Sequence, residues 1–330
     1  MLEEELLHYL MQNDQGLSGP QLADYFKVSR NAIWKACENL RQQGYTISSS
    51  RAGYRLTACR TDLDPKQIRY YLANWPDLKV MVNDVVDSTN NQAKTYLSQN
   101  PDSQALFIAK KQTAGRGRYG RQFTSDLAHG IYLSLAIPPH SQNPDDIPLY
   151  TLLTATALTE VLAKYVASPN QLKIKWINDL FYQGRKVVGI LCEAIADIES
   201  QSIEQLVIGC GLNLAGDFNQ ASPDVQKVAG TLFGSDLPEG FNLNQFIAEL
   251  VNRIAYYHEN LADKHFLTNY QKHLMGIGQV VDFEYDGKLN RGKILGINDS
   301  GHLRIQASDG QVLTFSKDNL HLSSQQFAHD

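Results

Sequence analysis

Residues 112–121 read QTAGRGRYGR and directly follow the apolar run ALFIAKK at 105–111. The three glycines let the backbone approach a ligand closely and present N–H groups to oxyanions. The three arginines can surround a group that carries several negative oxygens, such as a phosphate. The run lacks the GxxxxGK[ST] pattern of a Walker loop, and it is not a GxGxxG turn that opens a long helix. Taken alone, the run fits a flexible basic surface loop, or a glycine–arginine tract that binds nucleic acid, as well as it fits a ligand loop.

Four further motifs favour a ligand site around this loop. They are DSTN at 87–90, KWINDL at 175–180, GRKVVGILCE at 184–193 and IGCGLN at 208–213. Each also has a simpler structural interpretation. DSTN is typical of a helix N-cap, and IGCGLN is typical of a buried strand with close backbone packing. Asn-Asp followed by Arg-Lys across a Gly184 turn predicts a hairpin that brings opposite charges together.

The wider pattern predicts an α+β fold around these motifs. Strand-like runs occur at 79–86, 105–111, 130–137, 172–177, 186–195 and 204–210, and helical stretches at 89–97, 148–166, 243–261 and 266–274. Because several strands follow one another without an intervening helix, we expect a mixed sheet and not a doubly wound one. From residue 278, short strands separated by Asp-Gly turns predict a small barrel.

The first sixty residues predict three helices and a β-hairpin. Ser18 with a glutamine three residues later predicts a capping box for the second helix, and Ser29 caps the third. The third helix has a buried stripe at helical spacing, formed by Ile33, Cys37 and Leu40. The hairpin covers 45–58. This order of elements is typical of a winged helix-turn-helix.

The charge of this segment supports DNA binding. Residues 17–60 carry seven basic and two acidic residues, whereas the whole chain has a net charge of −5. Polar residues off the buried stripe of the third helix, and one at the tip of the hairpin, are placed to contact DNA. These residues are Ser29, Arg30, Asn31, Trp34, Lys35 and Arg51. The alternative is a protein-interaction module with a solvated basic face; helix order, capping and hairpin together favour DNA.

Composition bounds the class of protein. A chain of 330 residues with 43% hydrophobic residues predicts a globular protein of two or three domains. Its four cysteines show no paired spacing, which argues against a disulfide scaffold or a zinc ribbon and fits a reducing compartment. The acidic N-terminus is unlike a signal peptide, and no apolar run approaches the roughly 18 residues of a membrane span. We therefore expect a cytoplasmic protein without a membrane partner.

Taken in order, these motifs resemble the biotin–protein ligase family, and the N-terminal helices are similar to those of its bifunctional members, which also repress the biotin operon. The resemblance covers nearly the whole chain. It implies a winged helix-turn-helix domain at 1–60, a mixed-sheet catalytic domain of the biotin/lipoate-ligase type at 61–275 and an SH3-like barrel at 276–323. Three residues depart from the family pattern: Tyr119, Phe123 and Ile177, the last in place of a frequent proline.

The resemblance implies an ATP-dependent ligase reaction in two steps. Biotin and ATP give biotinyl-5′-adenylate and pyrophosphate, and the biotinyl group then passes to a lysine of the biotin carboxyl carrier protein of acetyl-CoA carboxylase. Mg²⁺ is implied with ATP, and no protein ligand for a metal is assigned. The resemblance also implies that the adenylate-bound chain forms a homodimer, which binds operator DNA of the biotin operon.

Site residues follow from the same resemblance. Those implied to bind biotin are Ser88, Thr89, Asn90, Gln112, Arg116, Gly117, Arg118 and Lys186. Those implied to bind the nucleotide are Gly115, Arg116, Arg118, Arg121, Asn178 and Asn213. Lys186, Arg118 and Asp179 are the implied catalytic residues. The chemistry agrees, because joining a carboxylate to a phosphate brings two anions together and needs cationic donors.

Two alternatives remain at this point. One is an enzyme similar to lipoate or octanoate ligases, which share the catalytic fold but typically carry a different arginine–glycine loop. The other is a biotin-sensing repressor whose ligase activity is vestigial. The presence of Lys186, Arg118 and Asp179 argues against the second. Biotin-dependent exchange between ATP and pyrophosphate separates all three.

Overall fold

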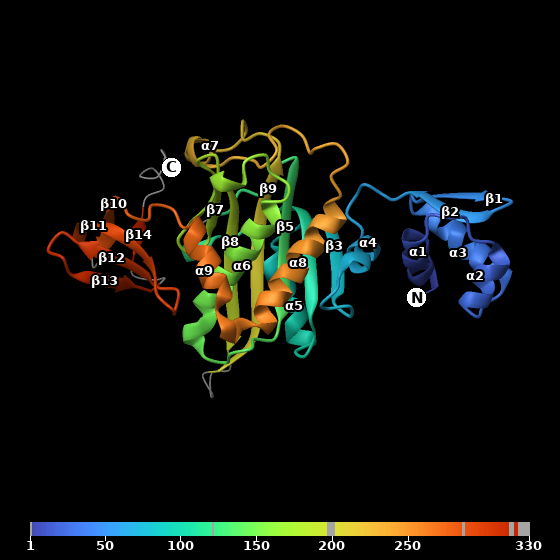
Figure 1. The fold of residues 1–330 in the computed structure, drawn as a ribbon, viewed down its shortest axis with the longest axis horizontal. Helices are drawn as coiled ribbons and strands as arrows, with labels where there is room; N and C mark the ends of the chain where they lie inside the picture. The colour runs from blue at the N-terminus through green and yellow to red at the C-terminus, as the bar shows by residue number, and fades with distance from the viewer. Residues whose placement is uncertain (1, 121, 197–201, 286–287, 317–319, 323–330) are drawn as a thin grey trace. The chain divides into compact units, whose positions relative to one another are not determined.

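The structure is a computed structural model that describes residues 2–120, 122–196, 202–285, 288–316 and 320–322. The chain divides into two compact units, Met1–Leu72 with Asn242–Ala248, and Ala73–Phe241 with Glu249–Asp330. Figure 1 labels the helices and strands of both units.

The first unit has the order of a winged helix-turn-helix. Its first elements are α1 (Leu2–Gln12), α2 (Gly19–Tyr25), α3 (Arg30–Gln42), β1 (Thr46–Ser50) and β2 (Gly53–Ala58). The capping box is confirmed, because the Ser18 side chain accepts from the Gln21 N–H and the Gln21 side chain accepts from the Ser18 N–H. Ser29 caps α3 by accepting from the N–H of Ala32 at 3.1 Å. The predicted stripe of α3 is buried.

A fourth helix, α4 (Pro65–Tyr71), continues the first unit. Asp64 caps it by accepting from the Lys66 N–H at 2.9 Å, and Pro65 occupies the first turn, where a missing N–H costs nothing. Arg69 of α4 pairs with Glu4 of α1, with Nη2 3.0 Å from Oε2. The Asp-Pro pair at 64–65 thus marks the start of this helix in the sequence.

A seven-stranded mixed sheet forms the centre of the second unit. Its spatial order is β3-β4-β5-β9-β8-β7-β6, and only β3 and β4 pair in parallel. The bounds are β3 (Lys79–Val86), β4 (Ala105–Gln112), β5 (His129–Ile137), β6 (Leu172–Lys175), β7 (Asp179–Tyr182), β8 (Arg185–Ala196) and β9 (Ile203–Ala215). The predicted α+β class with a mixed sheet is thus confirmed.

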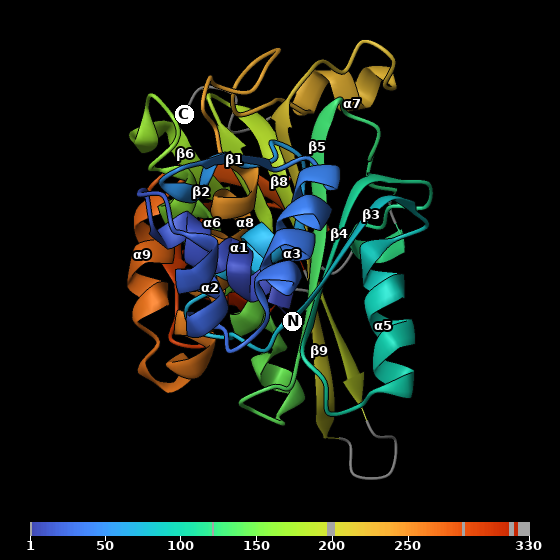
Figure 2. The ribbon, with the colours of Figure 1, turned by 90° about the vertical axis from the view of Figure 1, so that its right-hand side faces the viewer.

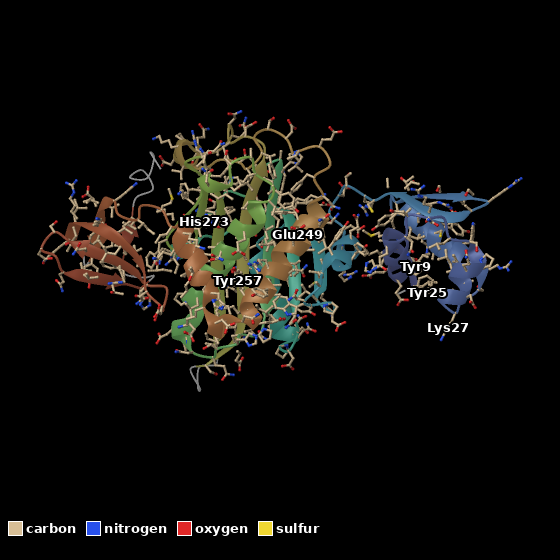
Figure 3. All side chains as sticks on the ribbon, in the orientation of Figure 1. Tyr9, Tyr25, Lys27, Glu249, Tyr257 and His273 are labelled. Atoms are coloured by element: carbon tan, nitrogen blue, oxygen red, sulfur yellow. The ribbon has the colours of Figure 1, made fainter. Side chains whose placement is uncertain are left out.

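Helices cover both faces of this sheet. Figure 2 shows α5 (Thr89–Gln99) on one side and α6 (Ile147–Leu162) with α9 (His265–His273) on the other. Glu160 of α6 accepts hydrogen bonds from Tyr257 of α8 (Leu243–Glu259) at 2.7 Å and from Asn269 of α9 at 2.8 Å, which ties α6 to α8 and α9. Tyr257 is labelled in Figure 3. The remaining elements before the C-terminal strands are η1 (Arg118–Gly120), η2 (Pro144–Asp146), η3 (Pro169–Gln171), α7 (Pro223–Val228), α8 (Leu243–Glu259) and η4 (Leu261–Asp263).

The C-terminal strands form a five-stranded antiparallel sheet in the order β13-β12-β11-β10-β14. They are β10 (Val280–Tyr285), β11 (Lys288–Ile297), β12 (Leu303–Ala307), β13 (Val312–Phe315) and β14 (His321–Leu322). Phe283 and Phe315 pack edge to face in its core, with ring centroids 5.4 Å apart. Among the described strands, β13 and β14 are edges that do not pair with each other. The predicted barrel is therefore confirmed only as an antiparallel sheet.

All four cysteines carry free thiols. Within the described ranges, no helix combines the length and the apolar character needed to cross a membrane.

Candidate active site

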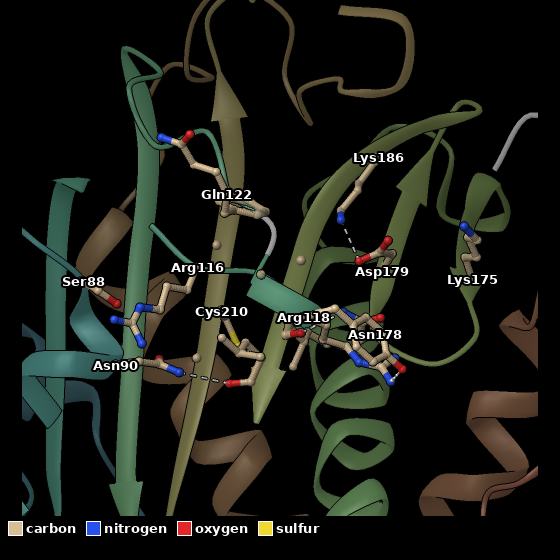
Figure 4. A pocket seen from close by; sticks show the side chains of 18 of the residues that line it. Ser88, Asn90, Arg116, Arg118, Gln122, Lys175, Asn178, Asp179, Lys186 and Cys210 are labelled. Carbon is tan, nitrogen blue, oxygen red and sulfur yellow. Dashed lines mark hydrogen bonds and ion pairs between the residues drawn. The ribbon is translucent and has the colours of Figure 1, made fainter. Parts of the chain in front are cut away.

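One pocket in the second unit brings together most of the predicted ligand residues (Figure 4). The predicted residues that line it are Ser88, Thr89, Asn90, Gln112, Arg116, Gly117, Arg118, Asn178, Asp179 and Lys186. Gly115 and Asn213 are not among the lining residues, and Arg121 lies outside the described residues. Segments from almost one hundred residues of chain thus converge on one site.

The first turn of α5 supplies one polar end of the pocket. Ser88 holds the N-cap position, but its hydroxyl makes no capping hydrogen bond, so the capping interpretation of DSTN does not describe this side chain. Thr89 donates its N–H to Gln112 Oε1 at 2.8 Å. The Ala114 N–H donates to the Asp87 carbonyl at 2.8 Å. These bonds hold the start of the glycine–arginine loop against the start of α5.

Hydrogen bonds also keep Asp87 ionised beside this turn. Its carboxylate accepts from the amides of Asn91 at 2.6 Å and Gln92 at 2.8 Å. Partial burial raises the pKa of Asp87, but these hydrogen bonds outweigh it and hold the pKa below its usual value. The residue therefore acts as a charged anchor for the helix start.

Three glycines make the floor of the pocket where β8 and β9 run side by side. Gly189 and Gly211 are register partners. A Cβ on Gly189 would lie 2.7 Å from a Phe123 ring carbon, and one on Gly211 would lie 2.5 Å from another, so the ring rests on bare backbone. A Cβ on Gly209 would lie 2.2 Å from Asn90 Oδ1. The predicted close packing of IGCGLN is confirmed, and glycine is required because Phe123 and Asn90 occupy the space of a side chain.

Lys186 and Asp179 bring a pair of opposite charges to the pocket. Lys186 Nζ lies 2.7 Å from Asp179 Oδ1 across the β7–β8 turn, which confirms the predicted hairpin with opposed charges. Asp179 Oδ1 is buried and accepts no hydrogen bond of good geometry from the described residues, so the contact is an ion pair. Asn178 donates its amide to the Ile190 carbonyl at 2.9 Å, which fixes β7 to β8. Its nucleotide contact stays a prediction.

The glycine–arginine loop folds back on itself. The Phe123 N–H donates to the Gly115 carbonyl at 3.0 Å, and Arg116 forms a bridge with Gln122. Arg118 donates from Nη2 to Tyr119 Oη at 2.9 Å, and its guanidinium carbon lies 5.0 Å from the ring centroid. Tyr119, one of the three departures from the family pattern, therefore contacts the arginine next to it.

The other two departures also have structural positions. Phe123 forms a wall of the pocket, 6.2 Å from the buried Tyr132 between ring centroids. Burial raises the pKa of Tyr132 to about 12. The peptide bond between Trp176 and Ile177 is cis.

Two predicted nucleotide residues, Gly115 and Asn213, do not line the pocket. A Cβ on Gly115 would lie 2.5 Å from Ser125 Oγ, so this glycine permits the loop's close packing. Asn213 is buried on β9, and its amide nitrogen lies 3.5 Å from the Lys186 carbonyl. Its Oδ1 has no hydrogen-bond partner among the described residues. This acceptor is consistent with the predicted nucleotide contact, which remains a prediction.

Several lining residues were absent from the predicted site. They include Tyr119, Gln122, Phe123, Lys175, Trp176, Gly189, Gly209, Cys210, Gly211, Leu320 and Leu322. The glycines had a signal, because glycine inside a strand marks close approach of another group. Burial raises the pKa of Cys210 well above its usual value, and the neighbouring Cys192 adds to the rise. This thiol is therefore protonated and is no nucleophile.

The predicted DNA-contacting residues are all exposed on the first unit. Those on α3 and at its cap are Ser29, Arg30, Asn31, Trp34 and Lys35, and Arg51 lies in the β1–β2 turn. Trp34 is 52% exposed, which is unusual for a tryptophan without a binding partner. Contact with DNA stays a prediction.

Comparison with known proteins places the chain in a family. Residues 82–213 match the biotin/lipoate A/B protein ligase family, and residues 3–55 match an HTH domain family. The chain is 30% identical over 328 residues to the bifunctional ligase/repressor BirA of Bacillus spizizenii, covering 96% of this chain and 98% of that protein. This chain belongs to the bifunctional ligase/repressor family. The corresponding protein of Bacillus subtilis is 29% identical with the same coverage.

A solved structure shows the same fold. The biotin protein ligase from Aquifex aeolicus, in complex with biotin and ATP, superposes with a TM-score of 0.59 at 23% identity. The match covers 74% of this chain and 98% of that one. Membership of the ligase/repressor family thus rests on sequence similarity over 96% of the chain, and the superposed fold agrees with it.

Proposed function

We propose that this ligase/repressor joins biotin to a lysine of the biotin carboxyl carrier protein and represses the biotin operon when its adenylate is bound. The observation that carries the ligase half is the composition of one pocket. Neutral hydrogen-bonding side chains and cations line it together, with Asp179 as the one carboxylate among the described lining residues; the neutral ones include Ser88, Thr89, Asn90 and Gln112, and the cations are Arg116, Arg118, Lys175 and Lys186. Such a pocket suits a ligand with a polar uncharged head and an anionic tail.

The first step joins the biotin carboxylate to the α-phosphorus of ATP. One carboxylate oxygen forms the new bond to phosphorus, the bond to the β-phosphate bridge breaks, and pyrophosphate leaves. Lys186 and Arg118 supply positive charge where the two anions meet, which stabilises the charge that spreads over the phosphate oxygens. No side-chain nucleophile takes part.

The second step transfers the acyl group. The lysine amine of the carrier protein attacks the acyl carbonyl, the bond to the phosphate oxygen breaks, and AMP leaves while the amine loses a proton. Asp179, next to Lys186, is the carboxylate placed to orient that amine. Arg116, Gly117 and the rest of the loop retain the adenylate until the carrier arrives.

Mg²⁺ enters with the nucleotide in this proposal. The described residues contain no group of three or more His, Cys, Asp or Glu side chains placed to hold a metal ion. Mg²⁺ commonly binds through substrate phosphates and keeps several waters, so the proposal assigns it no protein ligand. The metal supplies charge neutralisation of the phosphates when bound.

The repressor half rests on the first unit. A winged helix reads two half-sites when the protein is a dimer. Occupation of the pocket by adenylate orders the loop at 113–121, the ordered surface favours a homodimer, and two copies of α3 then reach a palindromic operator. Consumption of adenylate by the carrier lifts repression. The C-terminal strands belong to an SH3-like domain, and the free cysteines suit a cytoplasmic protein.

Exchange of label between pyrophosphate and ATP tests the ligase. We expect exchange that depends on biotin and is absent with lipoate or octanoate. Exchange driven by an octanoyl substrate points to the lipoate-type alternative, and no exchange with tight biotin binding points to a repressor with vestigial activity. Sedimentation with and without biotin plus ATP, alongside operator binding, tests the regulatory half. If adenylate changes neither self-association nor operator affinity, that half fails and the ligase half stands.

A further inference from the structure

A chain of buried polar contacts runs from the pocket to a carboxylate outside it. Asn90 of α5 lies on the pocket floor and is 4% exposed. Its Oδ1 lies 2.5 Å from Ser134 Oγ, which lies 2.7 Å from Thr89 Oγ1, which in turn lies 3.1 Å from Gln112 Oε1. Ser134, on β5, is completely buried. Its hydroxyl therefore depends on buried neighbours for its hydrogen bonds.

Glu193 fixes the orientation of the Asn90 amide at the inner end of this chain. Asn90 Nδ2 donates to Glu193 Oε2 at 2.7 Å and to the Leu191 carbonyl at 3.3 Å. Both groups are acceptors only, so the amide nitrogen must face them and the amide oxygen must face Ser134. Lys94 Nζ lies 2.5 Å from Glu193 Oε1 and compensates the charge of the carboxylate.

The number of available hydrogens then determines which hydroxyl donates to which oxygen along this series of contacts. Three oxygen–oxygen contacts link Gln112, Thr89, Ser134 and Asn90, but only the two hydroxyls carry hydrogens. One contact must therefore lack a hydrogen, and repulsion is least when this is the longest, the 3.1 Å contact to Gln112. Ser134 donates to Asn90, and Thr89 donates inward to Ser134.

The consequence at the pocket is an acceptor. With its hydrogen directed to Ser134, Thr89 Oγ1 presents lone pairs to the ligand. The Thr89 N–H holds Gln112 Oε1 beside it at 2.8 Å, so two acceptors stand together. A ligand head with N–H donors satisfies them, and the cyclic urea of biotin carries such N–H groups. If the Asn90 amide turned over, its N–H would donate to Ser134, and the Thr89 hydrogen would point to Gln112.

We propose that Glu193 is a positioning residue for the urea ring: it orients the Asn90 amide and, through Ser134, sets the Thr89 hydroxyl as an acceptor. The inference rests on the proposed function. Glu193 does not line the pocket and contacts no reacting atom. Its effect belongs to biotin recognition and not to the transfer chemistry.

The test replaces the carboxylate by its amide. Glu193→Gln keeps the shape but offers both a donor and an acceptor, so it no longer dictates the orientation of Asn90. We expect biotin affinity, measured by calorimetry without ATP, to fall about ten- to a hundredfold, the range for a buried hydrogen bond to a mismatched partner. The KM for ATP and kcat at saturating biotin should stay within about twofold. A general structural defect would lower kcat and the ATP parameters as well.

A double-mutant cycle with Thr89→Val tests the route. Thr89→Val removes the hydroxyl that Glu193 is inferred to orient, so adding Glu193→Gln should cost less than about a further twofold in biotin affinity. Independent, multiplied losses overturn the inference, and so does wild-type biotin affinity in Glu193→Gln. If Glu193→Gln does not fold, Ser134→Ala cuts the same chain at its middle, and the same loss and the same non-additivity are expected.

A matched control is Glu249→Gln. Glu249 of α8, labelled in Figure 3, forms an ion pair with Lys164 at 2.9 Å and does not line the ligand pocket. We expect no change in biotin affinity. Biotin binding by the unmodified protein distinguishes a failure of the proposed function from a failure of this inference. If it binds no biotin, the proposed function and this inference both fail. If it binds biotin and Glu193→Gln binds it equally well, this inference alone fails.

Discussion

Lys186 and Asp179 form an ion pair across the β7–β8 turn, with Nζ 2.7 Å from Oδ1. The side chains remain 26% and 18% exposed, so both open to the pocket and neither is sealed in the core. Asp179 therefore holds the lysine ammonium at a fixed position before any ligand arrives. An incoming anion meets a positioned cation and needs no large rearrangement of it.

Removal of that cation should impair adenylate formation. We expect Lys186→Ala to slow pyrophosphate exchange by about two to four orders of magnitude, the range for loss of a transition-state charge stabiliser. The fold should survive because the residue directly follows a turn. Lys164→Ala, which breaks the ion pair with Glu249, is the control and should leave exchange unchanged. Near-normal exchange in Lys186→Ala would remove this lysine from the mechanism.

Loss of the loop arginine should release the intermediate. Arg118→Gly removes a guanidinium from the pocket wall, so we expect adenylate synthesis to continue while its retention weakens. Escaped acyl-adenylate reacts with exposed amines, and bystander proteins mixed with the variant should become biotinylated. Blotting with a biotin-binding probe measures this. Labelling confined to the carrier, at the normal rate, would contradict the role.

Because the Phe123 ring rests on the glycines of the pocket floor, the effect of Gly211→Ala on stability should depend on whether Phe123 is present. Gly211→Ala places a methyl group 2.5 Å from the ring, and overpacking of this kind costs about 1–3 kcal/mol. In a Phe123→Ala background the space is open, and alanine is preferred to glycine inside a strand. We expect the same substitution there to be neutral or stabilising. Urea unfolding of the four proteins measures both differences, and equal costs in the two backgrounds would refute the contact.

His258 should make the protein sensitive to acid. Burial, with a smaller contribution from His140, lowers the pKa of His258 to about 3. Between pH 6.5 and 3 the unfolded chain binds a proton that the folded protein excludes. The free energy of unfolding therefore falls on acidification, by up to about 1.4 kcal/mol per pH unit. His258→Phe should show a shallower loss between pH 7 and 5 in urea titrations; an unchanged slope would assign the acid sensitivity elsewhere.

The β1–β2 hairpin should contribute electrostatic attraction to DNA and not recognition of bases. Arg51 lies exposed in the β1–β2 turn, where a phosphate contact is the simplest interaction. We expect Arg51→Ala to weaken operator and nonspecific DNA binding alike and to reduce the slope of log affinity against log salt by about one. Asn31→Ala, on α3, should instead reduce the preference for the operator. If Arg51→Ala relaxed specificity and left the slope unchanged, the assignments would be reversed.

Sequence patterns predicted what depends on local chemistry. The caps at Ser18 and Ser29 are set by residues three apart, and the charged hairpin around Gly184 needs only its own two strands. The link through Ser134 was out of reach, because a single serine inside the apolar run IYLSLAI carries no sign of its partners. Its neighbours Thr89 and Asn90 lie more than forty residues earlier and meet it only through sheet order.

The role of the glycines in the pocket floor could be predicted only in part from the sequence. Their motif was recognised, but the ring that rests on two of them belongs to the loop after β4, which no spacing rule connects to β8 and β9. The closure of the C-terminal strands was predicted too strongly, because Asp-Gly turns fix hairpins and do not fix whether the outer strands meet.

The strand order of the central sheet determines which parts of the protein can fold first during synthesis on the ribosome. The buried residues of the helical core around α3 span Leu6 to Ile47, and Tyr54 and Leu56 of the hairpin pack against them, so this core can form once the hairpin has emerged. The pocket needs β5 to pair with β9, so Tyr132 waits for Gly211, almost eighty residues later. A nascent chain thus displays the face of α3 well before it has anywhere to bind biotin. A chain released early would carry a DNA-binding module without the sensor that governs it.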